Sequence, residues 1–167
     1  VERDSAESVF RKISASWPEG SRFLVTFAVS APASLPWVEV RDGLMHSGFH
    51  RLVHDNAVLD IQELTERPTE GQDHFTVLVD RLVLNPRSKK RIHDSLEQAF
   101  HYGKGRLTLI LPDADHVEHA FSNQLECAAC RITYREPVPN MFSFNSPLGA
   151  CEACRGFGRT IDIDMEL

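Results

Sequence analysis

The stretch HFTVLVDRLVL, residues 74–84, is the clearest strand signal in the chain. Phe75, Val77 and Val79 alternate with other residues, which directs their side chains to one face of an extended segment. We therefore predict a strand over residues 74–84.

The residues after this strand predict a helix and then a second strand. Ser88 is the expected N-cap of a helix that continues to about His101. The inner stripe of this helix has helical spacing and consists of Ile92, Leu96 and Phe100. Gly103 and Gly105 close the helix, and RLTLILP, residues 106–112, predicts the next strand.

The residues before this strand predict two helices, another strand and a hairpin. Ser5 is the expected N-cap of the first helix, whose apolar residues recur at helical spacing. A second helix ends at Gly48, and Asp55-Asn56 forms the hairpin turn. The expected order is a helix over 5–17, a strand over 22–29, a helix over 37–47 and a hairpin over 49–61. Together these elements predict a mixed α+β unit over residues 1–120.

The 167 residues are 42% hydrophobic and 25% charged, which is the composition of a soluble globular protein. This length allows one domain with a small appendage. We find neither the roughly 18 apolar residues that a membrane span needs nor a secretory leader, so we expect a cytoplasmic protein without a membrane partner. The chain starts without Met and stops after a strand-like alternation, so we expect a piece of a longer protein. The net charge of −6 argues against coating nucleic acid by bulk electrostatics.

All four cysteines lie in two Cys-x-x-Cys pairs, Cys127 with Cys130 and Cys151 with Cys154. Disulfides need an oxidising compartment and a thioredoxin-like redox site needs only one pair, so both are the weaker alternatives. The 20 residues between the pairs agree with the spacing of zinc sites, in which two knuckles supply four thiolates. Because a closed shell of four sulfurs leaves no position for water, we predict a structural Zn²⁺ site.

The histidines have weaker claims to a metal. His46, His50 and His54 fall four residues apart, but a glycine interrupts any helix between them, so we interpret them as a solvated face. His116 and His119 precede the first cysteine pair and are alternative zinc ligands. With four cysteines available, we do not expect either histidine to bind the metal.

Sequence motifs of catalysis are missing from the chain. It contains no Gly-x-x-x-x-Gly-Lys-Ser/Thr, Gly-x-Ser-x-Gly or His-Glu-x-x-His. The acid and base types in HDSLEQAFHYG, residues 93–103, lie on a helix with a clear apolar stripe, which makes them its solvated face. RGFGR, residues 155–159, resembles a phosphate loop only faintly, because glycines directly after a cysteine pair serve tight turns. We expect no catalytic residue in this chain.

The string FSFNSPLGACEACRGFG, residues 142–158, with CAAC at 127–130, closely resembles the first zinc-finger segment of the UvrA family, the DNA-damage recognition component of the bacterial excinuclease. Three upstream stretches are similar to the same family: SGFHRLVHDNAVLDI at 47–61, FTVLVDRL at 75–82 and RIHDSLEQAF at 91–100. The resemblance therefore covers most of the chain.

The resemblance implies an insertion in the first of two ATP-binding cassettes of a dimeric DNA-damage sensor that hydrolyses ATP and loads UvrB. Residues 1–120 would dock UvrB, and residues 121–167 would be a zinc-finger segment leading into the signature domain. Arg51 and Arg81 would contact acidic groups on UvrB, since guanidinium groups pair bidentately with carboxylates. ATP and DNA would be bound by the parent protein.

One departure from the family leaves another partner open. Family members carry a basic stretch where this chain reads SAPASLPWVEVRDG, residues 30–43, whose only cation is Arg41. A divergent paralogue with a different partner is therefore one alternative.

The other alternative is a zinc module that binds DNA directly. Its phosphate contacts would come from Arg131, Arg135, Arg155 and Arg159. Because three glutamates accompany these arginines, residues 126–160 carry a net charge of only +1, which weakens this hypothesis.

Overall fold

The computed structural model describes residues 3–68, 73–114, 116–126, 132–134, 138–143, 146, 150, 151 and 154. The chain divides into two compact units, Val1–Ile132 and Thr133–Leu167. The second unit contains the 3₁₀ turn η3, Pro139–Phe142. All regular strands and α-helices described below belong to the first unit.

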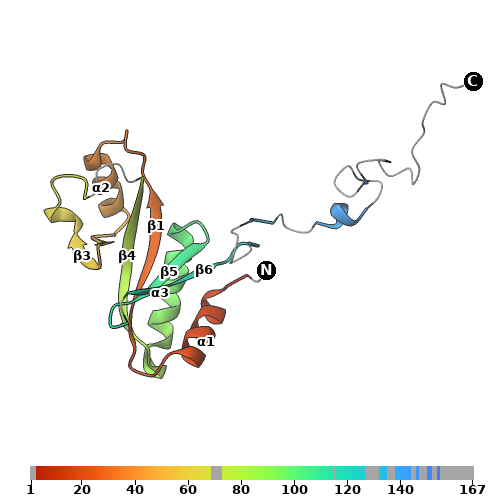
Figure 1. Ribbon diagram of the computed structural model, residues 1–167, viewed down its shortest axis with the longest axis horizontal. Coiled ribbons are helices and arrows are strands. Elements are labelled where there is room, and N and C mark those ends of the chain that lie inside the picture. Colours follow the sequence, from red (N-terminus) through yellow and green to blue (C-terminus); the bar gives the residue numbers. More distant parts are fainter. Residues whose placement is uncertain are drawn as a thin grey trace, which may run out of the picture. The chain divides into compact units, whose positions relative to one another are not determined.

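A six-stranded antiparallel sheet, in the order β3-β2-β4-β1-β5-β6, is the frame of the first unit. Its strands are β1 Arg22–Ser30, β2 Arg51–His54, β3 Ala57–Asp60, β4 His74–Val83, β5 Arg106–Leu111 and β6 Val117–Ser122. Figure 1 shows the two long strands β1 and β4 side by side at the centre. The strand predicted over residues 74–84 is therefore a central strand.

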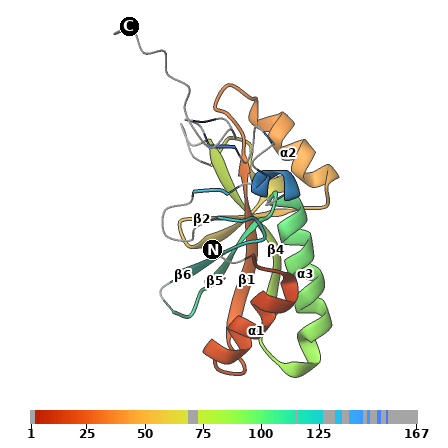
Figure 2. The ribbon, with the colours of Figure 1, turned by 90° about the vertical axis from the view of Figure 1, so that its right-hand side faces the viewer.

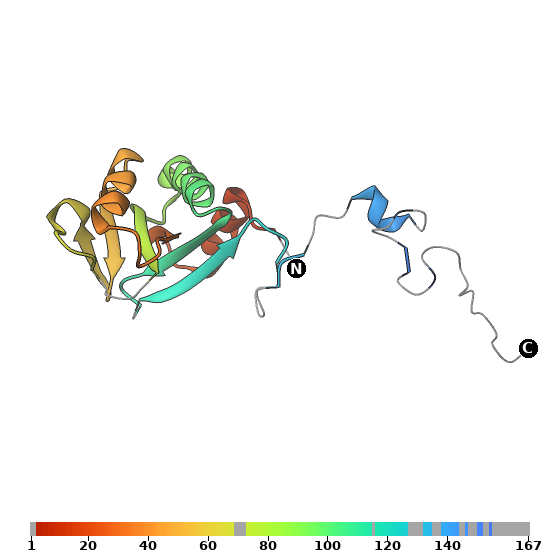
Figure 3. The same ribbon diagram turned by 90° about the horizontal axis from the view of Figure 1, so that it is seen from above.

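Three α-helices cover one face of this sheet: α1 Ala6–Ser16, α2 Trp37–His46 and α3 Lys89–Tyr102. Figures 2 and 3 show all three on the same side of the strands. The 3₁₀ turns η1 Ile61–Glu63 and η2 Pro86–Ser88 lie in the connections. This layering of helices on an antiparallel sheet confirms the predicted α+β class. No helix in the described ranges is long and apolar enough to span a bilayer.

Local features of the sequence explain where the first helix begins and where the hairpin turns. The Ser5 hydroxyl accepts the Ser8 N–H at 3.1 Å, and the Ser8 hydroxyl accepts the Ser5 N–H at 2.8 Å. This reciprocal pair makes Ser5 the N-cap of α1, as predicted. Asp55 and Asn56 have φ angles of 45° and 63°, which short polar residues tolerate and which the tight β2–β3 turn requires.

Two features differ from the sequence-based prediction. The Ser88 side chain makes no capping hydrogen bond, and the Asn85 side chain instead accepts the Ser88 N–H at 2.8 Å, which starts η2 ahead of α3. Strand β6 was not predicted, because an edge strand of exposed and half-buried residues carries little apolar alternation. Strand β6 belongs to the first compact unit, Val1–Ile132.

The core lies between the sheet and the helices in two clusters. The cluster under α1 and α3 takes from the sheet Phe23, Val25, Leu82, Leu107 and Leu109, and it includes Leu84, the residue after β4. The predicted α3 stripe is buried in it: Ile92, Leu96 and Phe100. The cluster under α2 takes from the sheet Phe27, Leu52, Phe75 and Val77. The opposite, open face of the sheet carries a smaller cluster of Leu24, Leu78 and Ile110.

A β-bulge interrupts the pairing of the two central strands. On β1 the consecutive residues Val25 and Thr26 lie opposite Asp80 and Leu78 of β4. Val79 therefore has no partner of its own and is the extra residue of the bulge.

The bulge decides which β4 side chains face the helices. Val77, before it, and Leu82, after it, both enter the helix-side core, although a regular strand would point them to opposite faces. Between them, Asp80 turns toward α3, where it accepts a hydrogen bond from Ser95. Arg81 consequently faces the open side of the sheet.

Arg67 organises the loop between β1 and α2, the loop that departs from the family resemblance. Its guanidinium donates to the carbonyl oxygens of Ala31 at 3.1 Å, Pro32 at 3.0 Å and Leu35 at 2.9 Å. The same guanidinium lies over the Phe75 ring, 5.1 Å from its centroid. One cation from another part of the chain therefore holds this neutral loop in place.

Arg67→Ala is expected to lower the free energy of unfolding by about 1–3 kcal/mol, because charged hydrogen bonds and a cation–π contact are lost. Urea unfolding followed by tryptophan fluorescence measures the change. Arg87→Ala removes an exposed arginine of η2 and is the control, with an expected change below about 0.5 kcal/mol. Equal effects of the two substitutions would contradict a role for Arg67 in holding the loop.

Candidate protein-interaction groove

A groove follows the edge of β4 that β2 leaves uncovered. Within the described residues, β2 pairs with β4 only through Leu52↔Val77 and Val53↔Thr76, whereas β4 continues to Val83. We call this hollow the arginine groove, and its charged lining residues are Arg51, Asp60, Asp80, Arg81 and Arg91. They come from β2, β3, β4 and α3, so only the folded sheet brings them together.

The two arginines predicted as partner contacts lie together in this groove. Arg51 opens β2 and precedes the buried Leu52, so it faces away from the core under α2. Arg81 faces the same open side because of the bulge. Both residues are exposed, and neither guanidinium makes an ion pair or hydrogen bond with another residue that the structure describes.

Asp80 is fully engaged at the boundary between the groove and α3. Arg91 donates to it twice, from Nη2 to Oδ1 at 2.8 Å and from Nε to Oδ2 at 2.9 Å. The Arg81 N–H adds a bond to Oδ1 at 2.8 Å and the Ser95 hydroxyl one to Oδ2 at 3.1 Å. Four donors therefore reach the two oxygens, and the single Ser95 proton is shared with the Arg91 carbonyl oxygen at 2.9 Å.

These contacts hold Asp80 in its charged form. Partial burial raises the pKa of Asp80, but the hydrogen bonds from Arg91, the Arg81 N–H and Ser95, with the charge of Arg91, outweigh burial. The pKa of Asp80 consequently lies below its ordinary value. In turn, the hydrogen bonds and charge of Asp80 raise the pKa of Arg91.

A second carboxylate lies beside the other predicted arginine. Asp60 of β3 is directly opposite Arg51 in the β2–β3 register, so both side chains share a face. Asp60 Oδ1 accepts the Gln62 N–H at 2.9 Å, which begins η1. This carboxylate caps a turn and forms no ion pair with Arg51 in the described structure.

The arginine groove is therefore suited to binding acidic groups. Arg51 and Arg81 offer open, planar donor forks, while Asp80 is engaged by internal donors and Asp60 accepts the Gln62 N–H at one oxygen. Guanidinium forks bind carboxylates through paired, charge-assisted hydrogen bonds. An acidic surface on a partner is the complementary ligand.

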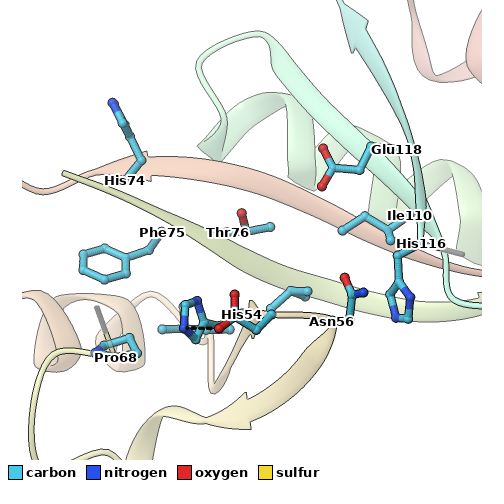
Figure 4. A pocket seen from close by; sticks show the side chains of 12 residues that line it. His54, Asn56, Pro68, His74, Phe75, Thr76, Ile110, His116 and Glu118 are labelled. Carbon is cyan, nitrogen blue, oxygen red and sulfur yellow. Dashed lines mark ion pairs between the residues drawn. The ribbon is translucent and has the colours of Figure 1, made fainter. Parts of the chain in front are cut away.

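A second hollow lies on the open face near the β2–β3 turn, and three histidines line it (Figure 4): His54, His74 and His116. His54 Nε2 lies 3.2 Å from Asp55 Oδ2, and Figure 4 shows His74 pointing away from His54. Within the described ranges, no three His, Cys, Asp or Glu side chains are arranged to hold a metal. Of the other histidines considered above, His119 packs against Trp17 with ring centroids 5.3 Å apart.

Most residues of the predicted zinc and DNA sites lie outside the described residues. These are Cys127, Cys130, Arg131, Arg135, Arg155 and Arg159. Cys151 is exposed and Cys154 is half-buried.

Sequence reasoning did not connect Asp80 with Arg91. In the sequence, Arg91 lies in a predicted helix and Asp80 in a predicted strand, and no motif links the two. The alternation of the strand would have placed Asp80 on the open face, because no local signal indicates a bulge at Val79. The acidic residue between two apolar runs in LVDRLVL, residues 78–84, is the one available hint.

Comparison with known proteins relates this unit to one family. Residues 4–113 match the family model described as the UvrA interaction domain. UvrABC system protein A of Streptococcus mutans serotype c is 32% identical over 150 residues, which is 90% of this chain and 16% of that protein. The proteins of the same name from Streptococcus pneumoniae serotype 4 and Streptococcus pyogenes serotype M1 are 29% identical over 167 residues, 100% of this chain and 17% of each relative. The chain spans about a sixth of the length of these relatives.

Asp80→Asn is expected to lower the free energy of unfolding at pH 7, and the loss is expected to shrink in acid. Because folding lowers the pKa of Asp80, the carboxylate stabilises the fold above its unfolded pKa of about 3.9. This contribution disappears as the pH falls through the folded pKa. Urea unfolding of both proteins at pH 7, 5 and 3 measures it.

Asp94→Asn, on the exposed side of α3, is the control, and its expected effect at pH 7 is below about 0.5 kcal/mol. A difference between the wild type and Asp80→Asn that stayed constant from pH 7 to pH 3 would contradict this role of the carboxylate.

Proposed function

Because this chain belongs to the UvrA family, through the UvrA interaction domain at residues 4–113, we propose that its α+β unit docks UvrB. The observation that carries the proposal is the arginine groove, where Arg51 and Arg81 lie exposed on one side of the sheet. Neither has an internal ion-pair partner in the described structure. The groove supports docking to acidic side chains of the partner.

Docking of this kind is electrostatic and directional. Each guanidinium presents a planar fork that pairs with one carboxylate, so two forks fix both position and orientation. The arginines stand on β2 and β4 of one sheet, so their backbone is already ordered before binding. Opposite charges also speed association, and salt weakens this effect.

The role of the whole parent protein is part of the same proposal. A UvrA-type protein would bind damaged DNA and hydrolyse ATP in nucleotide excision repair, and this unit would bring UvrB to it. The unit contributes binding and positioning, and the ATPase chemistry belongs to other parts of the parent.

The neutral loop between β1 and α2 is compatible with docking through the groove. The loop has no lysine, and Arg67 is engaged with loop carbonyl oxygens. The positive charge offered to the partner would therefore be concentrated in the arginine groove. The alternative is docking to a different acidic protein. The binding experiment with UvrB distinguishes this alternative from docking to UvrB.

We also propose a structural Zn²⁺ site made by Cys127, Cys130, Cys151 and Cys154. Four thiolates in two Cys-x-x-Cys pairs are the donor set that structural zinc prefers. The exposed Cys151 and half-buried Cys154 support it, since a metal can reach both residues. Zinc would tie the two pairs together in a segment too short for a sizeable core.

The alternative hypothesis is direct DNA binding by Arg131, Arg135, Arg155 and Arg159. It predicts an affinity for DNA that falls steeply with salt and that depends on these four arginines. The docking proposal instead predicts that substitutions in the arginine groove leave any DNA affinity of the chain unchanged.

Arg51→Glu and Arg81→Glu are each expected to weaken UvrB binding at least tenfold, because each places a like charge against an acidic surface. Isothermal titration calorimetry with purified UvrB at about 50 mM and about 300 mM salt measures the affinity, and wild-type binding is expected to weaken with salt. Arg11→Glu, on the exposed side of α1 and outside the groove, is the matched control.

The control variant should bind like the wild type. Failure of the unmodified chain to bind UvrB, or equal weakening by all three substitutions, would overturn the docking role.

The zinc proposal predicts about one Zn²⁺ per purified chain, and about none after Cys151→Ser with Cys154→Ser. Elemental analysis measures the metal content. Urea unfolding of the α+β unit is expected to be unchanged, because both cysteines belong to the second compact unit. Metal retained by the double variant would contradict the four-cysteine site.

A further inference from the structure

The inference here deepens the docking role and rests on it. The arginine groove contains a carboxylate that ought to oppose an acidic partner, since Asp80 lines the same hollow as Arg51 and Arg81. Asp80 is also the sequence neighbour of Arg81. An unoccupied carboxylate at this position would repel acidic groups and compete for the same guanidinium forks.

We propose that Arg91 is a positioning residue of the groove, which occupies Asp80 and so keeps Arg51 and Arg81 open to an acidic partner. The geometry supports this role through the paired bonds of 2.8 and 2.9 Å from Arg91 to the two oxygens of Asp80. The Arg81 N–H and Ser95 fill the remaining acceptor positions. Both oxygens of Asp80 therefore already accept hydrogen bonds from donors other than the Arg81 side chain.

The position of Arg91 on α3 makes it suited to this task. Asp80 points toward α3 because of the bulge, and Arg91 lies one helical turn before Ser95, so both donors reach the same carboxylate. Arg91 itself is exposed, and it donates hydrogen bonds to Asp80 from Nε and Nη2. The formal charges of the five charged lining residues sum to +1, and without Arg91 they cancel.

Two roles of Arg91 predict different outcomes for a second substitution. If Arg91 acts by neutralising Asp80, then Arg91→Gln weakens partner binding only because Asp80 is left negative and partly unpaired. Removing that charge as well should restore binding. If Arg91 instead contacts the partner directly, removal of the Asp80 charge restores nothing.

The test is a double-mutant cycle of Arg91→Gln and Asp80→Asn, with affinity for UvrB measured by calorimetry at about 50 mM salt. Arg91→Gln is expected to weaken binding about tenfold. Asp80→Asn alone should bind as tightly as the wild type or more tightly. The double variant should return to within about threefold of the wild type.

A double variant as weak as Arg91→Gln, or an Asp80→Asn variant about tenfold weaker than the wild type, would overturn the proposal. Urea unfolding of each variant verifies that it is folded under the conditions of the binding experiment.

A second probe separates this inference from the docking role itself. An octaglutamate peptide is titrated into the isotopically labelled chain and followed by NMR. The titration measures the affinity of the groove for an acidic peptide in the absence of UvrB. The same order of affinities is expected: wild type and double variant alike, Arg91→Gln weaker. If UvrB failed to bind but the peptide gave this order, the docking role would fall while the role of Arg91 would stand. Equal peptide binding by all variants would overturn the role of Arg91.

Discussion

The extra residue at Val79 is the constraint on which the site depends. Phe75 and Val77 must face α2, and Leu82 and Leu84 must face α1 and α3, all on one side of the sheet. A regular strand of period two cannot bury both sets on the same face, because they differ by an odd number of residues. The bulge resolves this conflict, and its consequence is that Asp80 points toward α3 and Arg81 toward the open side.

The groove follows from that arrangement and from the shortness of β2. Because β2 begins at Arg51 while β4 extends to Val83, part of the β4 edge stays uncovered beside α3. Proteins usually protect such an edge with charged residues. Here the two carboxylates accept hydrogen bonds from internal donors, and Arg91 is paired with Asp80. Arg51 and Arg81 have no internal acceptor among the described residues. This division makes the edge suited to binding acidic groups.

Much of the fold could be predicted from sequence because it is local. The α1 cap, the Asp55-Asn56 turn and the α3 stripe each depend on residues within a few positions of one another. Strand β6 and the Asn85 cap were missed, since an edge strand has weak alternation and Ser88 was the more obvious capping residue. The bulge could not be predicted, because it is a compromise between two core clusters formed by helices far apart in the chain.

In the site, too, local features could be predicted from sequence and long-range ones could not. The family resemblance indicated Arg51 and Arg81 as partner contacts. Simple alternation from Phe75 through Val79 would have placed Arg81 in the core. Their meeting in one groove, and the engagement of Asp80 by Arg91, depend on long-range register. The most direct test is to titrate UvrB into the labelled chain and observe the arginine side-chain Nε–H signals by NMR. We expect the signals of Arg51 and Arg81 to shift while those of Arg11 and Arg22 do not; shifts confined to arginines outside the groove would contradict docking through the groove.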